Sequence, residues 1–145
     1  YGRRHNKFLY RIYSDLFITF TRPIEQGILS GASWVIIGAA VTIFIFNENT
    51  AIIGLLVLSI ADSAAAIVGI KFGKTQLFSK SLEGSTAFFI TATIIVFSLS
   101  SAAAYVNFIA VIAATVVELF STPRINDNLL IPMVLALILT IGGVG

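Results

Sequence analysis

Five long apolar runs dominate this chain and limit it to a small set of folds. They cover residues 28–46, 51–72, 86–105, 108–120 and 129–144. Four of them approach the length of roughly 20 residues that a helix needs to cross about 30 Å of hydrocarbon. Because 57% of the residues are hydrophobic and only 11% are charged, a soluble domain is excluded. The sequence predicts an all-α, polytopic integral membrane protein with about five transmembrane helices.

The segment before the first run has a different character. Residues 1–22 combine five basic side chains with apolar residues at helical spacing, which predicts a basic amphipathic helix lying in the membrane interface. The alternative is the end of a longer upstream helix. Residues 23–145 are predicted to form the transmembrane domain. Since the sequence begins with Tyr1 rather than methionine, we expect an N-terminal part to be missing.

All nine lysine and arginine residues fall on one side of this five-span arrangement. The N-terminal segment and the loops 71–85 and 121–128 share that side, whereas the connections around 47–50 and 105–107 carry no basic residue. Such a bias predicts a cytoplasmic N-terminus and an external C-terminus. The expected location is the cell membrane of a prokaryote or the endoplasmic reticulum membrane of a eukaryote. The alternative class of function is a small transporter or a non-catalytic membrane scaffold. A single charged face argues against the transporter.

The composition also restricts the chemistry that a site could use. The chain has no cysteine and one histidine, His5, which excludes thiolate chemistry and His-rich metal sites. A catalytic metal would need oxygen ligands, and a hard cation such as Mg²⁺ fits that requirement.

Asp62 interrupts the second apolar run ten residues before its end. On a straight helix it would lie about 15 Å deep, where a charge costs at least about 2.5 kcal/mol and usually indicates function. Ala65, Ala66, Gly69 and Gly73 would share its helix face and admit a ligand from the cytoplasm. The alternative is helix packing through these small residues, with Asp62 hydrogen-bonded across the interface.

The loop after this run suits phosphate. Residues 69–75 come one residue short of a P-loop and follow a helix rather than a strand, so a P-loop NTPase is rejected. Its glycines still allow close backbone approach, and Lys74 supplies a positive charge. Lys80 and Ser81 stand just before the next helix, whose first N–H groups favour an anion.

Glu83 in the same loop would bind a metal or orient Lys80. The alternative for this loop is an ordinary cytoplasmic connection in which Ser85 caps the following helix. Glu118, and Asp127 next to Asn128, return to the same face, although Asp127 is also expected to cap the last helix. Four acids from four segments therefore predict a Mg²⁺–nucleotide site, with the general base left open: Glu25, Asp62, Glu118 and Asp127.

These residues resemble the CTP-dependent lipid kinases, which include dolichol (polyprenol) kinase, phytol kinase and the CTP-using diacylglycerol kinase of fungi. The pattern runs from Arg22-x-x-Glu25 through Asp62-x-Ala-x-Ala-x-x-Gly-x-x-x-Gly-Lys74 and Lys80-Ser-x-Glu-Gly-Ser85 to Glu118 and Asp127-Asn128. The resemblance implies catalytic roles for Asp62, Glu118 and Asp127, and CTP binding by Gly69, Gly73, Lys74, Lys80, Ser81, Glu83, Gly84, Ser85 and Asn128.

By this resemblance, the γ-phosphate of CTP passes to the hydroxyl of a polyprenol, dolichol or diacylglycerol, with Mg²⁺ as cofactor and no nucleic-acid partner. Phosphatidate cytidylyltransferase has a similar pattern and is the alternative reaction, but its C-terminal His-containing signature is absent here. Many family members carry further N-terminal spans. Gly27-x-x-x-Gly31 offers a surface for self-association.

Overall fold

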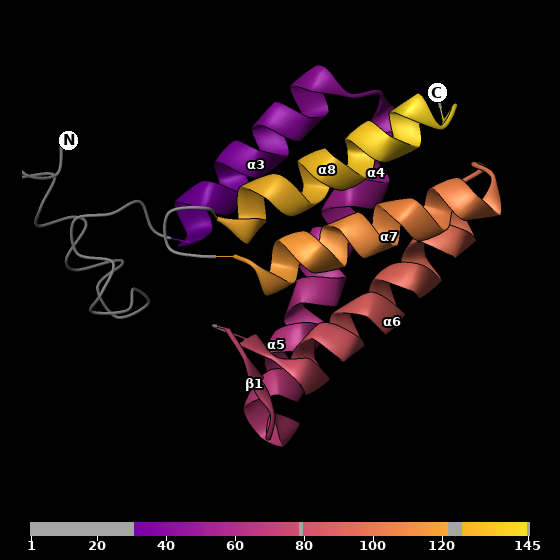
Figure 1. Cartoon of the computed structure of the whole chain (residues 1–145). Helices are drawn as coiled ribbons and strands as arrows, with labels where there is room; N and C mark the ends of the chain where they lie inside the picture. The colour runs from indigo at the N-terminus through magenta and orange to yellow at the C-terminus, as the bar shows by residue number, and fades with distance from the viewer. Residues whose placement is uncertain (1–30, 79, 122–125, 145) are drawn as a thin grey trace, which may run out of the picture. The chain divides into compact units, whose positions relative to one another are not determined.

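The computed structural model describes residues 31–78, 80–121 and 126–144. The chain divides into two units, 1–33 and 34–145, and nearly all of the described residues belong to the second unit. Most described residues are helical (Figure 1). The predicted interfacial segment and Glu25 lie outside the described residues. The elements are α3 (Gly31–Ile45), α4 (Glu48–Leu56), the π-helix η2 (Val57–Ala61), α5 (Asp62–Phe72), β1 (Gln76–Leu77), β2 (Lys80–Ser81), α6 (Leu82–Leu99), α7 (Ala104–Leu119) and α8 (Asp127–Ile141).

One continuous helical rod contains α4, η2 and α5 and corresponds to the second apolar run. Its π-turn ends immediately before Asp62. A π-turn adds a residue to the helical turn and changes the face that the following residues present. The predicted face of small residues is confirmed in part: Ala65, Gly69 and Gly73 all face Ser81 and the first turn of α6, whereas Ala66 is exposed.

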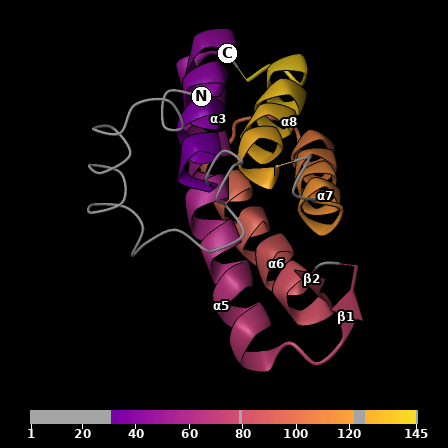
Figure 2. The same ribbon diagram turned by 90° about the vertical axis from the view of Figure 1, so that its left-hand side faces the viewer.

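The remaining helices pack along this rod and against one another. The α6 helix contacts α5 and α7, while α8 contacts α4 and α7; Figures 1 and 2 both show α7 beside α8. The α4 helix approaches α8 closely at Gly54, where an added Cβ would lie 2.8 Å from the Pro132 carbonyl oxygen. A glycine is needed there because any side chain would separate the two helices.

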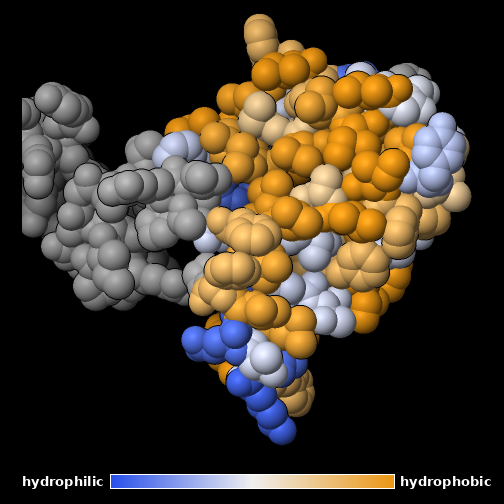
Figure 3. Space-filling view, viewed as in Figure 1, coloured by the Kyte–Doolittle hydropathy of each residue, from blue (hydrophilic) through white to orange (hydrophobic). Residues whose placement is uncertain are grey.

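Alanines share the interior of the bundle with larger apolar residues, and many large apolar residues also lie on its outside. Seven alanines are buried, each of them at most 5% exposed, whereas Ile36, Phe44 and Ile70 are 70%, 92% and 85% exposed. Figure 3 shows hydrophobic residues over most of one face and hydrophilic residues at the end that holds the hairpin. Large apolar side chains this exposed, above an interior that contains many alanines, are typical of helices that pack in lipid.

The break between the third and fourth runs differs from the prediction. The apolar runs predict a connection around 105–107, but α6 ends at Leu99 and α7 begins at Ala104. Ser100 adopts an extended conformation, and its hydroxyl accepts a hydrogen bond from Ala102 N at 3.1 Å. Such a turn competes with helix formation, so the chain leaves the helix early although its residues remain small or apolar.

Two helices among the described residues are long and apolar enough to cross a membrane, Glu48–Phe72 and Leu82–Leu99. The helices α3, α7 and α8 are apolar but have 15, 16 and 15 residues. The mostly helical fold is thus confirmed for the described part of the chain, and the number of spans remains a prediction.

Candidate functional site

A short hairpin connects α5 to α6 and organises the predicted phosphate loop. Strand β1 pairs with β2 in antiparallel register, with Gln76 opposite Ser81 and Leu77 opposite Lys80. The Ser81 hydroxyl accepts a hydrogen bond from Gly84 N at 3.1 Å and so caps α6. The alternative in which Ser85 caps this helix is therefore wrong, because α6 starts three residues before Ser85.

The predicted glycines bring α5 and α6 together at their hairpin ends. An added Cβ on Gly84 would lie 2.9 Å from the Ala65 carbonyl oxygen and 3.4 Å from Gly69 Cα. A Cβ added at Gly69 or at Gly73 would lie 3.0 Å from Ser81 Oγ, so a larger residue at either position would press against this hydroxyl. The structure thus shows close helix packing through these small residues, but among the residues it describes it does not show the hydrogen bond from Asp62 that this alternative includes.

Lys80 lies at the centre of a charged cluster drawn from separate elements. Its Nζ is 2.9 Å from Asp127 Oδ2 in the first turn of α8 and 3.2 Å from Glu118 Oε1 in the last turn of α7. The Lys80 side chain is 28% exposed, and that of Asp127 is 17% exposed. One lysine thus joins the hairpin to two helices that are distant in sequence.

Glu118 is the buried member of this cluster, with a side chain only 1% exposed. Besides Lys80, it accepts a hydrogen bond from the Ser85 hydroxyl, with 2.9 Å between Ser85 Oγ and Glu118 Oε2. Each carboxylate oxygen therefore has its own donor, as a buried charge requires.

Asp62 reaches the same cluster from the middle of the long rod. Its side chain is half-buried, and the charges of Asp127, Lys80 and Glu118 all act on it. None of the hydrogen bonds found among the described residues ends on its carboxylate. Three of the four predicted acids thus share one neighbourhood with Lys80.

The pKa of Lys80 reflects the balance of forces at this site. Burial by itself would lower that pKa, since it disfavours the charged form. The hydrogen bond and charge of Asp127, assisted by the charges of Glu118 and Asp62, outweigh burial and raise the pKa above its usual value. Lys80 therefore remains a permanent cation at neutral pH.

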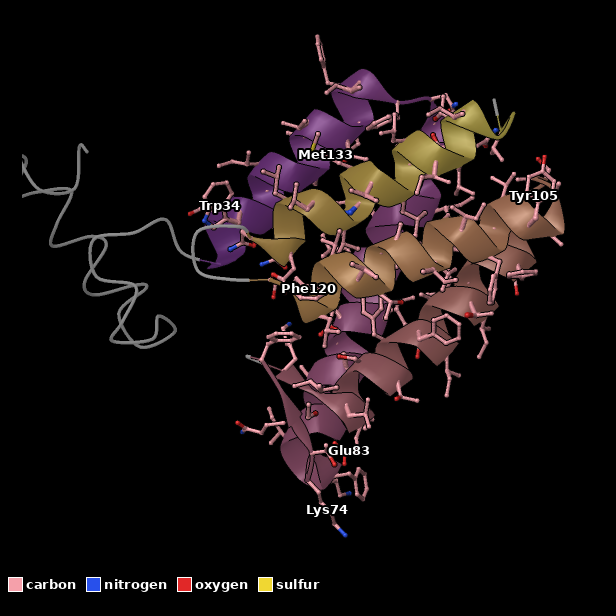
Figure 4. The ribbon with its side chains drawn as sticks, in the orientation of Figure 1. Trp34, Lys74, Glu83, Tyr105, Phe120 and Met133 are labelled. Atoms are coloured by element: carbon pink, nitrogen blue, oxygen red, sulfur yellow. The ribbon has the colours of Figure 1, made fainter. Side chains whose placement is uncertain are left out.

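Several predicted residues have other roles. Lys74 is exposed at the tip of the α5–α6 pair and points away from the bundle, as Figure 4 shows. Glu83 accepts hydrogen bonds from Thr75 N at 3.2 and 3.3 Å and so fixes the loop instead of orienting Lys80. The cap of α8 is Asn126, whose side chain accepts from Asn128 N at 3.0 Å. The expectation that Asp127 caps this helix is wrong by one residue, because α8 begins at Asp127 itself; its Oδ1 also accepts from Asn128 N at 3.0 Å, while its Oδ2 contacts Lys80.

Two carboxylates, those of Glu118 and Asp127, are placed to coordinate a metal ion together. Among the residues that the structure describes, no group of three or more acidic or histidine side chains is spaced to hold a metal ion. Glu118 and Asp127, however, each contact the same ammonium group. Two carboxylates supplemented by substrate phosphates are a common way to bind Mg²⁺, so the donor set fits this cation.

One contact at the site was absent from the sequence prediction. The ring of Phe78, in the hairpin turn, lies 4.8 Å from that of Phe120, which directly follows α7, with 43° between the ring planes. The only sequence signal for it is that each phenylalanine stands two residues from a member of the cluster, Lys80 or Glu118. That spacing becomes meaningful only when the hairpin is known.

Two longer relatives match nearly the whole chain. Uncharacterized protein RP860 of Rickettsia prowazekii (strain Madrid E) is 38% identical over an alignment of 149 residues. The match covers 95% of this chain and 72% of that protein. Uncharacterized protein MJ1137 of Methanocaldococcus jannaschii is 35% identical over 131 residues, 88% of this chain and 66% of that protein. Similarity over this length therefore extends to both a bacterial and an archaeal protein.

The chain belongs to the protein family that includes RP860. No family model and no solved structure matches it. The chain spans just under two thirds of MJ1137. Since the names of these relatives assign no reaction, a function has to be inferred from the site itself.

Proposed function

We propose that the protein is a CTP-dependent lipid kinase, which transfers the γ-phosphate of CTP to the hydroxyl of a membrane lipid alcohol such as a polyprenol or diacylglycerol. The observation that carries the proposal is Lys80 held between Glu118 and Asp127, with Asp62 close enough for its charge to act on them. The sequence resemblance assigns roles to these same residues, which come from four separate elements of the chain.

The charge balance of the cluster supports a cationic ligand. If all three acids are ionised, Asp62, Glu118 and Asp127 contribute three negative charges against the one positive charge of Lys80. Mg²⁺ bound with the nucleotide would supply the missing positive charge and neutralise the transferred phosphoryl group. Glu118 and Asp127 would hold it, and Lys80 would move from their carboxylates toward the phosphate oxygens.

Asp62 is assigned to the acceptor side of the reaction. It is half-buried in the middle of an apolar rod, at a depth that the hydroxyl of a lipid could reach from the bilayer. Its carboxylate would accept the hydroxyl proton as the acceptor oxygen bonds to the γ-phosphorus. The bond from that phosphorus to the β-phosphate oxygen breaks, and CDP leaves. Phosphoryl transfer depends on such positioning and charge neutralisation more than on covalent catalysis.

The membrane setting of this proposal rests on the outside of the bundle. Its exposed isoleucine and phenylalanine side chains, its alanine-rich interior and its two long apolar helices are all suited to lipid. A five-span topology would place the hairpin end in the cytoplasm, where CTP is available. The three helices of 15 or 16 residues, about 22–24 Å long, would then need local thinning of the bilayer.

The direct test uses purified protein in lipid nanodiscs with Mg²⁺, a panel of lipid alcohols and either γ-labelled CTP or γ-labelled ATP. We expect labelled phosphate to appear in lipid with CTP in preference to ATP, together with CDP. Release of pyrophosphate and incorporation of the cytidylyl group would instead indicate a cytidylyltransferase. If neither nucleotide is consumed with any lipid, the proposal is wrong.

Topology is tested separately by cysteine labelling, which has no background because the sequence contains no cysteine. Asn49 and Gln76 are both exposed and stand at opposite ends of the long rod. Cysteines introduced at these two positions should react with an impermeant maleimide from opposite faces of the membrane. Reaction of both from one face would contradict the five-span arrangement.

A further inference from the structure

Phe78 has a backbone conformation that a phenylalanine rarely adopts. It occupies the turn between Leu77 and Lys80, which pair with each other, and its φ angle is +57°. Turns of this kind favour glycine, asparagine or aspartate, because a bulky residue at positive φ is strained. Strain of this sort persists where the surroundings enforce it, and it is a reason to look for a function.

The ring of Phe78 stacks on Phe120 at 4.8 Å, but this pair is not part of the core. The two residues remain 70% and 53% exposed. Phe120 stands two residues after Glu118, and Phe78 stands two residues before Lys80. Two contacts therefore join the hairpin to the end of α7: the aromatic pair and the ion pair between Lys80 and Glu118, whose N–O distance is 3.2 Å.

We propose that Phe78, through its stacking on Phe120, is a positioning residue that holds the Lys80 ammonium between Glu118 and Asp127. The hairpin consists of two strands of two residues each, which is too short to be stable by itself. A lysine side chain also loses considerable rotational freedom when it is fixed. Anchoring the turn to α7 reduces both costs. The importance of Lys80 for nucleotide binding rests on the proposed function. The position of the Lys80 side chain can be tested without assuming that function.

The test measures how fast Lys80 reacts with a lysine-acylating reagent, by mass spectrometry of the full chain in nanodiscs. Lys74, exposed at the tip of the same end, serves as the internal reference. Phe78→Gly removes the ring and accepts positive φ without strain, whereas Phe78→Tyr keeps the ring. Phe72→Ala, which removes another exposed ring, is the matched control.

In Phe78→Gly, we expect the labelling of Lys80 relative to Lys74 to rise roughly three- to tenfold, the range that one aromatic pair can contribute. The ratio should stay unchanged in Phe78→Tyr and Phe72→Ala. The thermal midpoint of Phe78→Gly should not fall, because the loss of stacking is offset by the relief of strain. If lipid phosphorylation is observed, the same variant should raise the KM for CTP while kcat changes little.

Two results would overturn the inference. The first is an unchanged Lys80 ratio in Phe78→Gly. The second is a raised ratio accompanied by a lower thermal midpoint, since general loosening of the fold would then explain the exposure. Failure of the proposed kinase reaction looks different: no nucleotide is consumed by the wild-type protein, yet the labelling ratios still report whether Phe78 positions Lys80.

Discussion

The two ends of the helical bundle both contain buried polar groups, but they use them differently. At the end away from the hairpin, the Asn47 side chain accepts a hydrogen bond from Thr50 N at 3.0 Å and donates one to the Val144 carbonyl at 2.8 Å. The Thr50 and Thr140 hydroxyls lie 3.2 Å apart. All of these groups are neutral, and they satisfy the start of α4 and the end of α8, where helices leave backbone groups unpaired.

The hairpin end instead collects charges from four elements: Asp62 from α5, Lys80 from β2, Glu118 from α7 and Asp127 from α8. Burying charged groups costs more than pairing them usually returns, so a buried ion pair is poor evidence for a purely stabilising role. The neutral end is explained by the needs of its helices. The charged end is not, and this difference is the reason to assign chemistry to it.

The largest expected effect comes from neutralising the acid inside the long rod. Asp62→Asn should reduce lipid phosphorylation by about two orders of magnitude or more, since it removes a charge that the reaction uses and keeps the side chain's size. The protein should still insert and fold, because an amide is easier to bury than a carboxylate.

Glu48→Gln is the matched control, since Glu48 is an exposed acid at the opposite end of the same rod. It should leave the rate unchanged. A well-folded Asp62→Asn protein with near-normal activity would falsify the assignment of Asp62 and reduce the charged end to a structural feature.

The second effect concerns stability at the charged end. Lys80→Met leaves Glu118 buried without its cation, and we expect the free energy of unfolding to fall by about 3 kcal/mol. Adding Glu118→Gln to that variant removes the unpaired charge while an amide oxygen can still accept from Ser85, so part of the loss should be recovered. Reversible unfolding in mixed micelles measures both. Equal losses in the single and double variants would mean that Lys80 and Glu118 are not coupled.

The helical rods were predictable because long apolar runs are a strong signal that does not depend on tertiary detail. The described helices overlap the five runs, and the errors lie at their ends. The connection after α6 was misplaced because small residues, Ser100 to Ala104, fill the gap without a glycine or proline, and the hydrogen bond from Ala102 N to the Ser100 hydroxyl favours the turn. Hydropathy does not register such a local hydrogen bond.

The members of the site were predictable from charge placement, but their partners were not. Lys74 and Lys80 look equivalent in the sequence, since both precede a helix within the same basic loop. The hairpin separates them: its register brings Lys80 to Glu118 and Asp127, while Lys74 is directed away from the bundle. Register depends on the turn that contains Phe78 at an unusual φ of +57°, and a phenylalanine is no sequence signal for such a conformation.

A third and smaller effect is expected at the neutral end. Asn47→Ala removes the cap of α4 and the hydrogen bond to Val144, so the free energy of unfolding should fall by about 1–2 kcal/mol. The KM for CTP and for the lipid should stay unchanged, because the change lies at the opposite end of the rod. An altered KM for CTP, in a protein that remains folded, would show that the two ends are not independent and would weaken the comparison between them.

The smallest effect is expected from the lysine that the structure separates from the charged cluster. Lys74→Ala should change the KM for CTP by less than about threefold, because an exposed charge is screened by salt and contributes little to binding. Lys80→Ala should raise the same KM far more, since its ammonium lies beside the two carboxylates proposed to hold Mg²⁺ and can reach the phosphates from there. Lys80→Arg should restore only part of the affinity, because a planar guanidinium does not replace a compact ammonium. The measurement is a CTP titration at two salt concentrations with the three variants side by side. Comparable effects of Lys74→Ala and Lys80→Ala would mean that the hairpin end binds phosphate as a diffuse basic surface, and that the arrangement around Lys80 does not select the nucleotide's position.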